Sequence, residues 1–132
     1  MMLRFVAPYA LLLAAATWVA ACSSSSNPSG DDGYASCPTD APSTCPSAVP
    51  SWSSDVQPIV NLRCALGGQC HGPGGAEESM YNYTTYAGVK QNYITMETEL
   101  EGCKMPPSDA VAPTPAEWLT LVTWMVCGAP DN

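Results

Sequence analysis

The stretch Cys64-Ala-Leu-Gly-Gly-Gln-Cys70-His71 separates two apolar segments of this 132-residue chain. It contains two of the seven cysteines, and the only histidine of the sequence follows the second of them directly. Glycines lie within the stretch and again at 72–75, so no regular helix or strand can cross this part of the chain. The sequence therefore predicts a loop that carries unusually reactive residue types, and we look for the chemistry of the protein here.

A cysteine followed by a histidine is typical of the site at which c-type haem is attached to a protein. In such a site two thiols bond the porphyrin and the histidine binds the iron. The usual spacer between the cysteines has two residues, whereas Cys64 and Cys70 are separated by five. Gly67 and Gly68 would allow the additional residues to loop out. Alternatively, haem has been lost and Cys64 and Cys70 form a disulfide; the residues alone leave both interpretations open.

The N-terminus has the features of a bacterial export signal. Arg4 is followed by an apolar run over 5–19 that is shorter than a membrane-spanning helix. The run Val19-Ala20-Ala21-Cys22 resembles a lipobox, which predicts that residues 1–21 are a signal peptide and that Cys22 carries a lipid anchor. Ser23 and Ser24 lack the aspartate of an inner-membrane retention signal. We therefore expect a periplasm-facing protein of the cell envelope, anchored in the outer membrane.

The net charge and the number of cysteines restrict the classes of function that fit this chain. The chain has 12 acidic and 4 basic residues, one of which is Arg4 in the signal peptide, so the exported chain is more acidic still. This charge argues against nucleic acid as a partner. With Cys22 assigned to lipid, the remaining even number of cysteines indicates a disulfide framework in an exported protein. Either three disulfides form, or two form while Cys64 and Cys70 carry haem.

The exported chain divides into a tether and one folded domain. Residues 22–51 are rich in Ser, Pro and Gly and are expected to be disordered. Within this tether Cys37 and Cys45 lie close enough in sequence to close a small loop on each other, which would stiffen the tether or pin it to the domain. Residues 52–132 predict an all-α domain, small enough to need disulfides or a cofactor to stabilise a modest core.

Three helical regions are expected. Asp55 can cap a helix that tolerates Pro58 near its start and ends at Cys64. Thr84 or Thr85 can cap a short helix that reaches Lys90, and a second short run covers 94–100.

The last helix has the clearest signals. The run Thr114-Pro115-Ala116-Glu117 predicts a capping box with proline at the first helical position, and Gly128 predicts the end of the helix. Its apolar face contains Trp118, Leu121, Val122 and Met125. Cys127 near its end can reach back to Cys103, which would close a loop of about 25 residues and stabilise the fold by roughly 3 kcal/mol.

Between those cysteines lies Met105-Pro106-Pro107, where two prolines stiffen the loop that presents the Met105 thioether. Methionine and histidine together ligate the iron of many electron-transfer cytochromes. The order of the Pro58 helix, Cys70-His71, Thr85-Tyr86, Met105-Pro106-Pro107 and a terminal helix ending Gly128-Ala129-Pro130 resembles the small c-type cytochrome-like domains of bacterial exported lipoproteins. The resemblance covers residues 51–132.

This resemblance implies a cytochrome c-like helical domain around one covalently held haem c. It implies that Cys70, and in type and order also Cys64, bond the porphyrin, that His71 and Met105 ligate the iron, and that Cys103 and Cys127 form a disulfide. The function implied is a membrane-tethered electron carrier, with a redox protein as partner and no enzymatic activity. The alternative from another class is a haem-free interaction or structural module of the envelope, stapled by disulfides.

Other metal and hydrolytic chemistries fit less well. A blue-copper site needs two histidines, and the chain has one. Zinc bound by Cys64, Cys70 and His71 lacks a suitable fourth ligand nearby. No serine lies in a nucleophile-elbow pattern, which argues against a hydrolase of that class.

Overall fold

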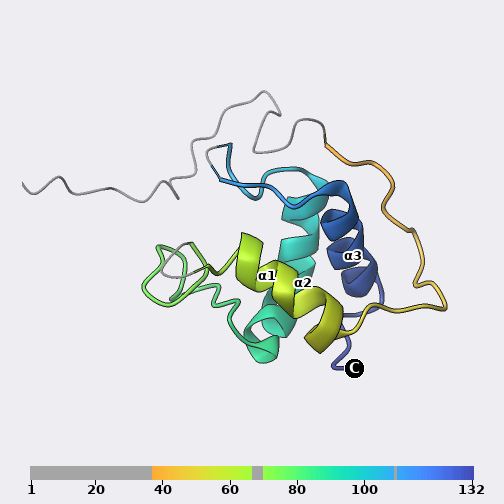
Figure 1. Ribbon diagram of the computed structural model, residues 1–132, viewed down its shortest axis with the longest axis horizontal. Coiled ribbons are helices and arrows are strands. Elements are labelled where there is room, and N and C mark those ends of the chain that lie inside the picture. The colour runs from red at the N-terminus through yellow and green to blue at the C-terminus, as the bar shows by residue number, and fades with distance from the viewer. Residues whose placement is uncertain (1–36, 67–69, 109) are drawn as a thin grey trace, which may run out of the picture.

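The computed structural model describes residues 37–66, 70–108 and 110–132, and within these ranges the regular structure is entirely helical (Figure 1). A π-helical turn, η1 (Trp52–Val56), continues into α1 (Gln57–Arg63). Two longer helices follow, α2 (Tyr86–Glu101) and α3 (Pro115–Val126). The all-α prediction is confirmed for these residues. The predicted signal peptide, 1–21, and the predicted lipid attachment at Cys22 lie outside the described residues.

The first helical segment begins earlier than predicted. Asp55 does not cap it from outside; the segment starts at Trp52, and the Asp55 carboxylate accepts a hydrogen bond of 2.7 Å from the backbone N–H of Ser51. Ser51 O in turn accepts from the N–H groups of Asp55 and Val56, at 3.0 and 3.1 Å. These bonds define the wide first turn. Pro58 is the second residue of α1 and follows this wide turn directly.

Helix α2 is one continuous helix of 16 residues, where the sequence had predicted two short runs. Thr85 is its N-cap, as expected, and its hydroxyl accepts a hydrogen bond from Gly88 N–H. The two runs merge because 91–93 contains no helix breaker, and because Val89, Met96 and Leu100 form one buried stripe along the entire helix.

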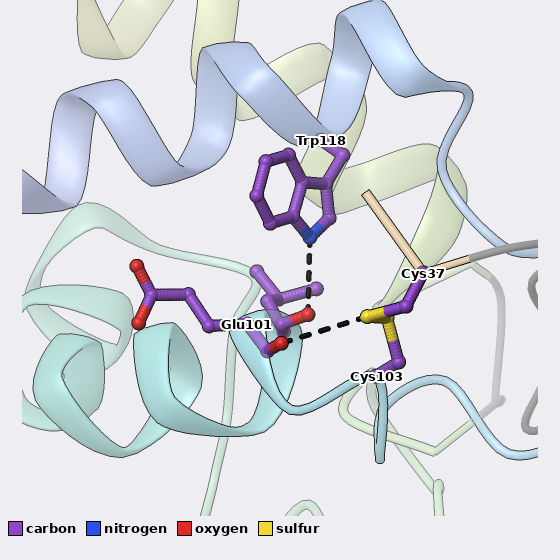
Figure 2. The surroundings of a disulfide bond; sticks show 5 residues. Cys37, Glu101, Cys103 and Trp118 are labelled. Atoms are coloured by element: carbon purple, nitrogen blue, oxygen red, sulfur yellow. Dashed lines mark hydrogen bonds between the residues drawn. A yellow bond between two sulfur atoms is a disulfide. The ribbon is translucent and has the colours of Figure 1, made fainter. Parts of the chain in front are cut away.

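Helix α3 confirms the predicted capping box, and Gly128 follows it with a positive φ of 79°. The four predicted core residues on α3 and Trp124 are all buried. Helix α3 packs antiparallel to α2, and Trp118, near its start, donates its indole N–H to Leu100 O near the end of α2 at 3.0 Å (Figure 2). The indole N–H of Trp124 donates to Pro130 O at 2.9 Å. The core of the domain therefore lies between α3, α2 and η1.

The disulfide pairing differs from both predicted pairs. Cys37 is bonded to Cys103 and Cys45 to Cys127, so the predicted Cys37–Cys45 and Cys103–Cys127 bonds are wrong. Residues 37–51, which we call the strap, run along the outer side of α3 (Figure 1). Eight extended residues span at most about 27 Å, enough to follow the roughly 18 Å length of a 12-residue helix. Cys37 and Cys45 therefore bond at opposite ends of α3 rather than to each other.

Candidate functional site

A cavity of about 430 Å³ lies between the end of α1, the described residues between 64 and 83, the second half of α2 and the loop that follows α2. All four residues predicted to hold haem line it: Cys64, Cys70, His71 and Met105. Leucine, tyrosine and proline side chains form much of its remaining wall. The volume falls within the range of roughly 300–1,000 Å³ that is usual for ligand and cofactor pockets. The fold thus gathers residues about forty positions apart in the sequence around one cavity.

Backbone hydrogen bonds bring the two ends of the five-residue spacer together. His71 N–H donates to Cys64 O at 3.2 Å, and Glu77 N–H donates to Cys70 O at 2.8 Å. Cys64 is a free thiol, while Cys70 is disulfide-bonded. The Cys64–Cys70 disulfide, one of the two interpretations of the spacer, is therefore wrong.

His71 is held in one orientation by its neighbours. Its Nδ1 lies 3.0 Å from Tyr81 O, and its ring stacks on the buried Tyr83 ring with centroids 4.3 Å apart. A carbonyl oxygen can only accept, so Nδ1 carries the proton and Nε2 is the nitrogen suited to bind a metal. Burial lowers the pKa of His71, although the Tyr81 carbonyl and Glu77 oppose the shift. The ring is thus neutral at pH 7, as a metal ligand must be.

Cys64 is a partly buried and unreactive thiol in this state. Desolvation raises its pKa to about 12, and the nearby positive charge of Arg63 offsets only part of that effect. Because the thiolate is the nucleophile, the thiol is inert at neutral pH. The residue thus faces the cavity without being a general thiol reagent.

Met105 reaches the cavity from the loop after α2. Its backbone N–H donates to Glu99 O at 3.3 Å, and its peptide bond to Pro106 is cis. Further along the loop, Ala110 N–H donates to Pro107 O at 2.9 Å, which closes a turn. The segment Met105-Pro106-Pro107, which the sequence predicted to be stiff, is therefore part of a loop that lines the cavity.

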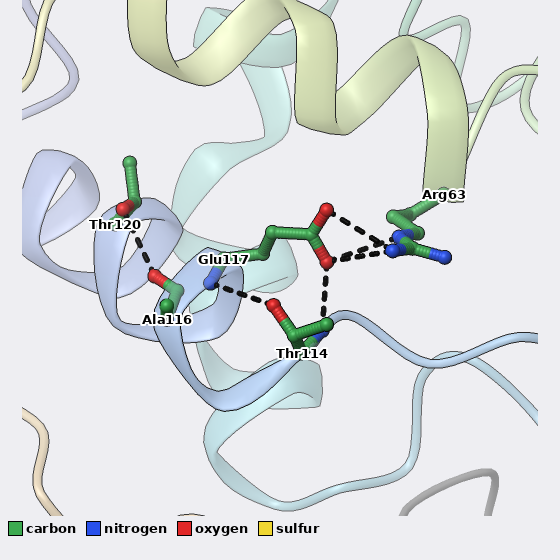
Figure 3. A network of polar contacts seen from close by, with 5 residues as sticks. All are labelled: Arg63, Thr114, Ala116, Glu117 and Thr120. Atoms are coloured by element: carbon green, nitrogen blue, oxygen red, sulfur yellow. Dashed lines mark hydrogen bonds and ion pairs between the residues drawn. The ribbon is translucent and has the colours of Figure 1, made fainter.

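An ion pair that the sequence analysis missed lies beside Cys64. The Arg63 guanidinium forms a bidentate ion pair with the Glu117 carboxylate, in which the Nε–Oε2 and Nη2–Oε1 distances are both 3.1 Å (Figure 3). Glu117 also accepts from Thr114 N–H at 2.7 Å. The pair joins the end of α1 to the start of α3. The capping box had singled out Glu117, but nothing local indicated Arg63 as its partner.

Tyr81 and Tyr83 were also not predicted as site residues. Tyr83 is buried, and its ring also orients His71. Tyr81 acts through its backbone carbonyl, which every residue type carries. No sequence signal could have identified that contact.

No protein-family model, curated protein or solved structure matches this chain. Among the described residues, no helix combines the length and the apolar character needed to cross a membrane. Within the same ranges, no three side chains of the His, Cys, Asp and Glu types gather in a way that could hold a metal ion. The candidate site therefore rests on the geometry of the cavity.

Proposed function

We propose that this protein is a membrane-tethered electron carrier of the bacterial envelope, and that the cavity receives one covalently attached haem. The observation that carries the proposal is that Cys64, Cys70, His71 and Met105 all line this one cavity. A bound haem supplies a one-electron couple at its iron. The protein itself would bind and orient the group, exclude water from it and catalyse no bond chemistry.

Each residue has a distinct role in this proposal. His71 would bind through Nε2, because the Tyr81 carbonyl engages Nδ1 and Tyr83 holds the ring. Met105 would supply a thioether as a second ligand of the iron, and a thioether ligand raises the reduction potential of a haem. Cys64 and Cys70 would provide the covalent links. The hydrogen bond from His71 N–H to Cys64 O supports this role, because it draws the ends of the long spacer together.

A second candidate is a haem-free, disulfide-stapled module of the envelope. The observation that favours it is the disulfide at Cys70, since a sulfur in a disulfide cannot also bond a porphyrin. The two candidates therefore make opposite demands on Cys70. In the haem-bound protein Cys70 must be absent from the disulfide map, whereas in the stapled module it must be present.

The test is to express the full chain in a host that has haem-attachment machinery and to purify it from the envelope. The haem proposal predicts a haem absorption spectrum, a haem-sized mass increment, and peptides in which Cys64 and Cys70 carry the group. Protein that has neither the absorption nor the mass increment, together with a Cys70 disulfide in the non-reduced peptide map, would establish the second candidate instead.

The substitution Met105→Ala distinguishes iron ligation by Met105 from simple packing. Loss of the thioether should lower the reduction potential strongly while the covalent haem and its mass increment remain. Met96→Ala is a matched control, because Met96 also lines the cavity but lies on α2. An equal change in potential in both variants would argue against Met105 as a ligand.

A further inference from the structure

We propose that the Cys37–Cys103 disulfide positions Met105 at the cavity, by holding the chain reversal at the end of α2 in a backbone conformation that cysteine otherwise disfavours. The inference rests on the proposed function for what Met105 binds. The positioning itself rests on contacts among the described residues and can be tested without haem.

The chain reversal after α2 is a Schellman motif. Lys104 N–H donates to Glu99 O at 2.9 Å, and Cys103 N–H donates to Leu100 O at 3.1 Å. The residue between these bonds must adopt a left-handed conformation, and Cys103 does so with φ 51°. Helix α3 ends in the same motif, but there the left-handed position belongs to Gly128, the residue type usually found there.

The glycine at position 102 directly precedes the strained Cys103 and therefore does not relieve the strain. Gly102 has φ −77° and could be any residue as far as that angle is concerned, while Cys103 carries the positive φ. A side chain at this position is unfavourable because its Cβ approaches the following carbonyl. Strain of this kind persists only where the surroundings hold the residue in place. Glycine at position 103 would remove the strain but would also remove the disulfide.

Cys103 is closely surrounded by the strap and by the last turn of α2. Its side chain is buried, at 4% exposure, and the bonded Cys37 sulfur lies 3.6 Å from Glu101 O (Figure 2). Because that sulfur is in a disulfide and has no hydrogen, this is a packing contact. Trp118 holds the same end of α2 through its hydrogen bond to Leu100 O. The disulfide thus fixes Cys103 against the last turn of α2.

The backbone conformation of Cys103 directly determines the position of Met105, two residues later in the chain. Glu99 O accepts from both Lys104 N–H and Met105 N–H, so the residues that complete the Schellman motif also set the backbone of Met105. Glu99, Leu100 and Met105 all line the cavity. The other disulfide, Cys45–Cys127, lies at the far end of α3, and no residue of α3 lines the cavity. It therefore offers a matched control.

The experiment compares the full-length double variants Cys37→Ser/Cys103→Ser and Cys45→Ser/Cys127→Ser. The two disulfides span sequence separations of 66 and 82 residues, so removing either changes the unfolded chain almost equally. Hydrogen exchange of the Lys104 and Met105 amides is the first readout. We expect exchange at both to be at least ~10-fold faster in the first variant than in the second. Equal exchange in the two variants would overturn the proposal.

A rescue variant keeps the test decisive if the first variant does not fold. Cys37→Ser/Cys103→Gly also lacks the disulfide, but glycine adopts the left-handed conformation without strain. We expect it to recover protection of the Lys104 and Met105 amides relative to Cys37→Ser/Cys103→Ser. If glycine recovers none of it, the disulfide does not act through the conformation of Cys103, and the proposal fails.

The haem-bound protein supplies the second readout. Loss of the Cys37–Cys103 bond should weaken the near-infrared band of thioether-to-iron charge transfer and lower the reduction potential, and loss of the Cys45–Cys127 bond should change neither. Wild-type protein without haem would refute the proposed function, whereas the amide exchange would still decide whether the disulfide positions Met105. The two failures can therefore be told apart.

Discussion

The ion pair between Arg63 and Glu117 gives a prediction whose size and pH dependence both follow from its geometry. The carboxylate accepts from two guanidinium nitrogens and from Thr114 N–H (Figure 3). The two charged side chains are 17% and 23% exposed, so water screens the pair in part. Glu117→Gln should therefore lower the free energy of unfolding by about 0.5–1 kcal/mol at neutral pH.

Glutamine is the informative replacement because it retains the capping box. The side chain of Gln at this position can still accept from Thr114 N–H, whereas Ala cannot. Glu117→Ala should therefore lose about 1 kcal/mol more than Glu117→Gln. The difference between the two variants measures the cap, and the effect of glutamine measures the charge.

The contribution of the Glu117 charge to the free energy of unfolding must disappear at acid pH. Burial tends to raise the pKa of Glu117, but hydrogen bonds from Arg63 and Thr114 and the charge of Arg63 outweigh it and lower the pKa. A carboxylate with a lowered folded pKa stabilises the fold fully above its unfolded pKa of about 4.3, and this stabilisation is lost as the pH falls through the folded pKa. The wild type and Glu117→Gln should therefore converge in stability at acid pH.

Urea unfolding at neutral pH and at two acid pH values measures this difference directly. A double-mutant cycle with Arg63→Gln should assign most of the glutamine effect to the pair. The reasoning is refuted if Glu117→Gln costs the same stability at every pH, or if the effects of Arg63→Gln and Glu117→Gln are simply additive.

Three further outcomes follow from the described side chains. Desolvation and the neighbouring Glu101 raise the pKa of Glu97, so Glu97→Gln should stabilise the fold at neutral pH by up to about 0.5 kcal/mol and have no effect at pH below about 4, as urea unfolding would show. A methyl group added at Gly88 would collide with the backbone oxygen of Asn82, so Gly88→Ala should lose roughly 1–3 kcal/mol despite the better helix propensity of alanine, and a thermal melt that shows no loss would contradict this. Cys64 should resist alkylation in the native haem-free protein and react on unfolding, whereas haem attached at Cys64 would block it in both states, which mass spectrometry distinguishes.

Local signals in the sequence predicted local features well. The capping box at Thr114 and the glycine stop at Gly128 act through hydrogen bonds between residues a few positions apart, so the bounds of α3 could be read directly. The merging of two predicted helices into α2 was missed because Thr and Tyr near its middle have modest helix propensity, which the burial of Met96 and Leu100 overrides. That burial depends on packing against α3, which the local sequence of α2 does not reveal.

The disulfides could not be predicted for the same reason. Sequence proximity favoured Cys37 with Cys45, but bond formation depends on where the strap passes relative to α3. Cys64, Cys70, His71 and Met105 all line one cavity, and Cys70 is disulfide-bonded there. The orientation of His71 by the Tyr81 carbonyl could not be predicted, because every residue type carries a backbone oxygen.

The two disulfides also bear on where this chain can be stable. Each closes a loop that the loop-entropy relation values at roughly 4–5 kcal/mol, and the loops interleave, so the two contributions are less than additive. Small domains have a net stability of only about 5–15 kcal/mol, so losing both bonds would remove much of it. A fold with this dependence is suited to an oxidising compartment, which agrees with the proposed export. The same bond that stabilises the strap, Cys37–Cys103, also holds the turn that carries Met105, so in our proposal an oxidising environment would be needed for the site as well as for the fold.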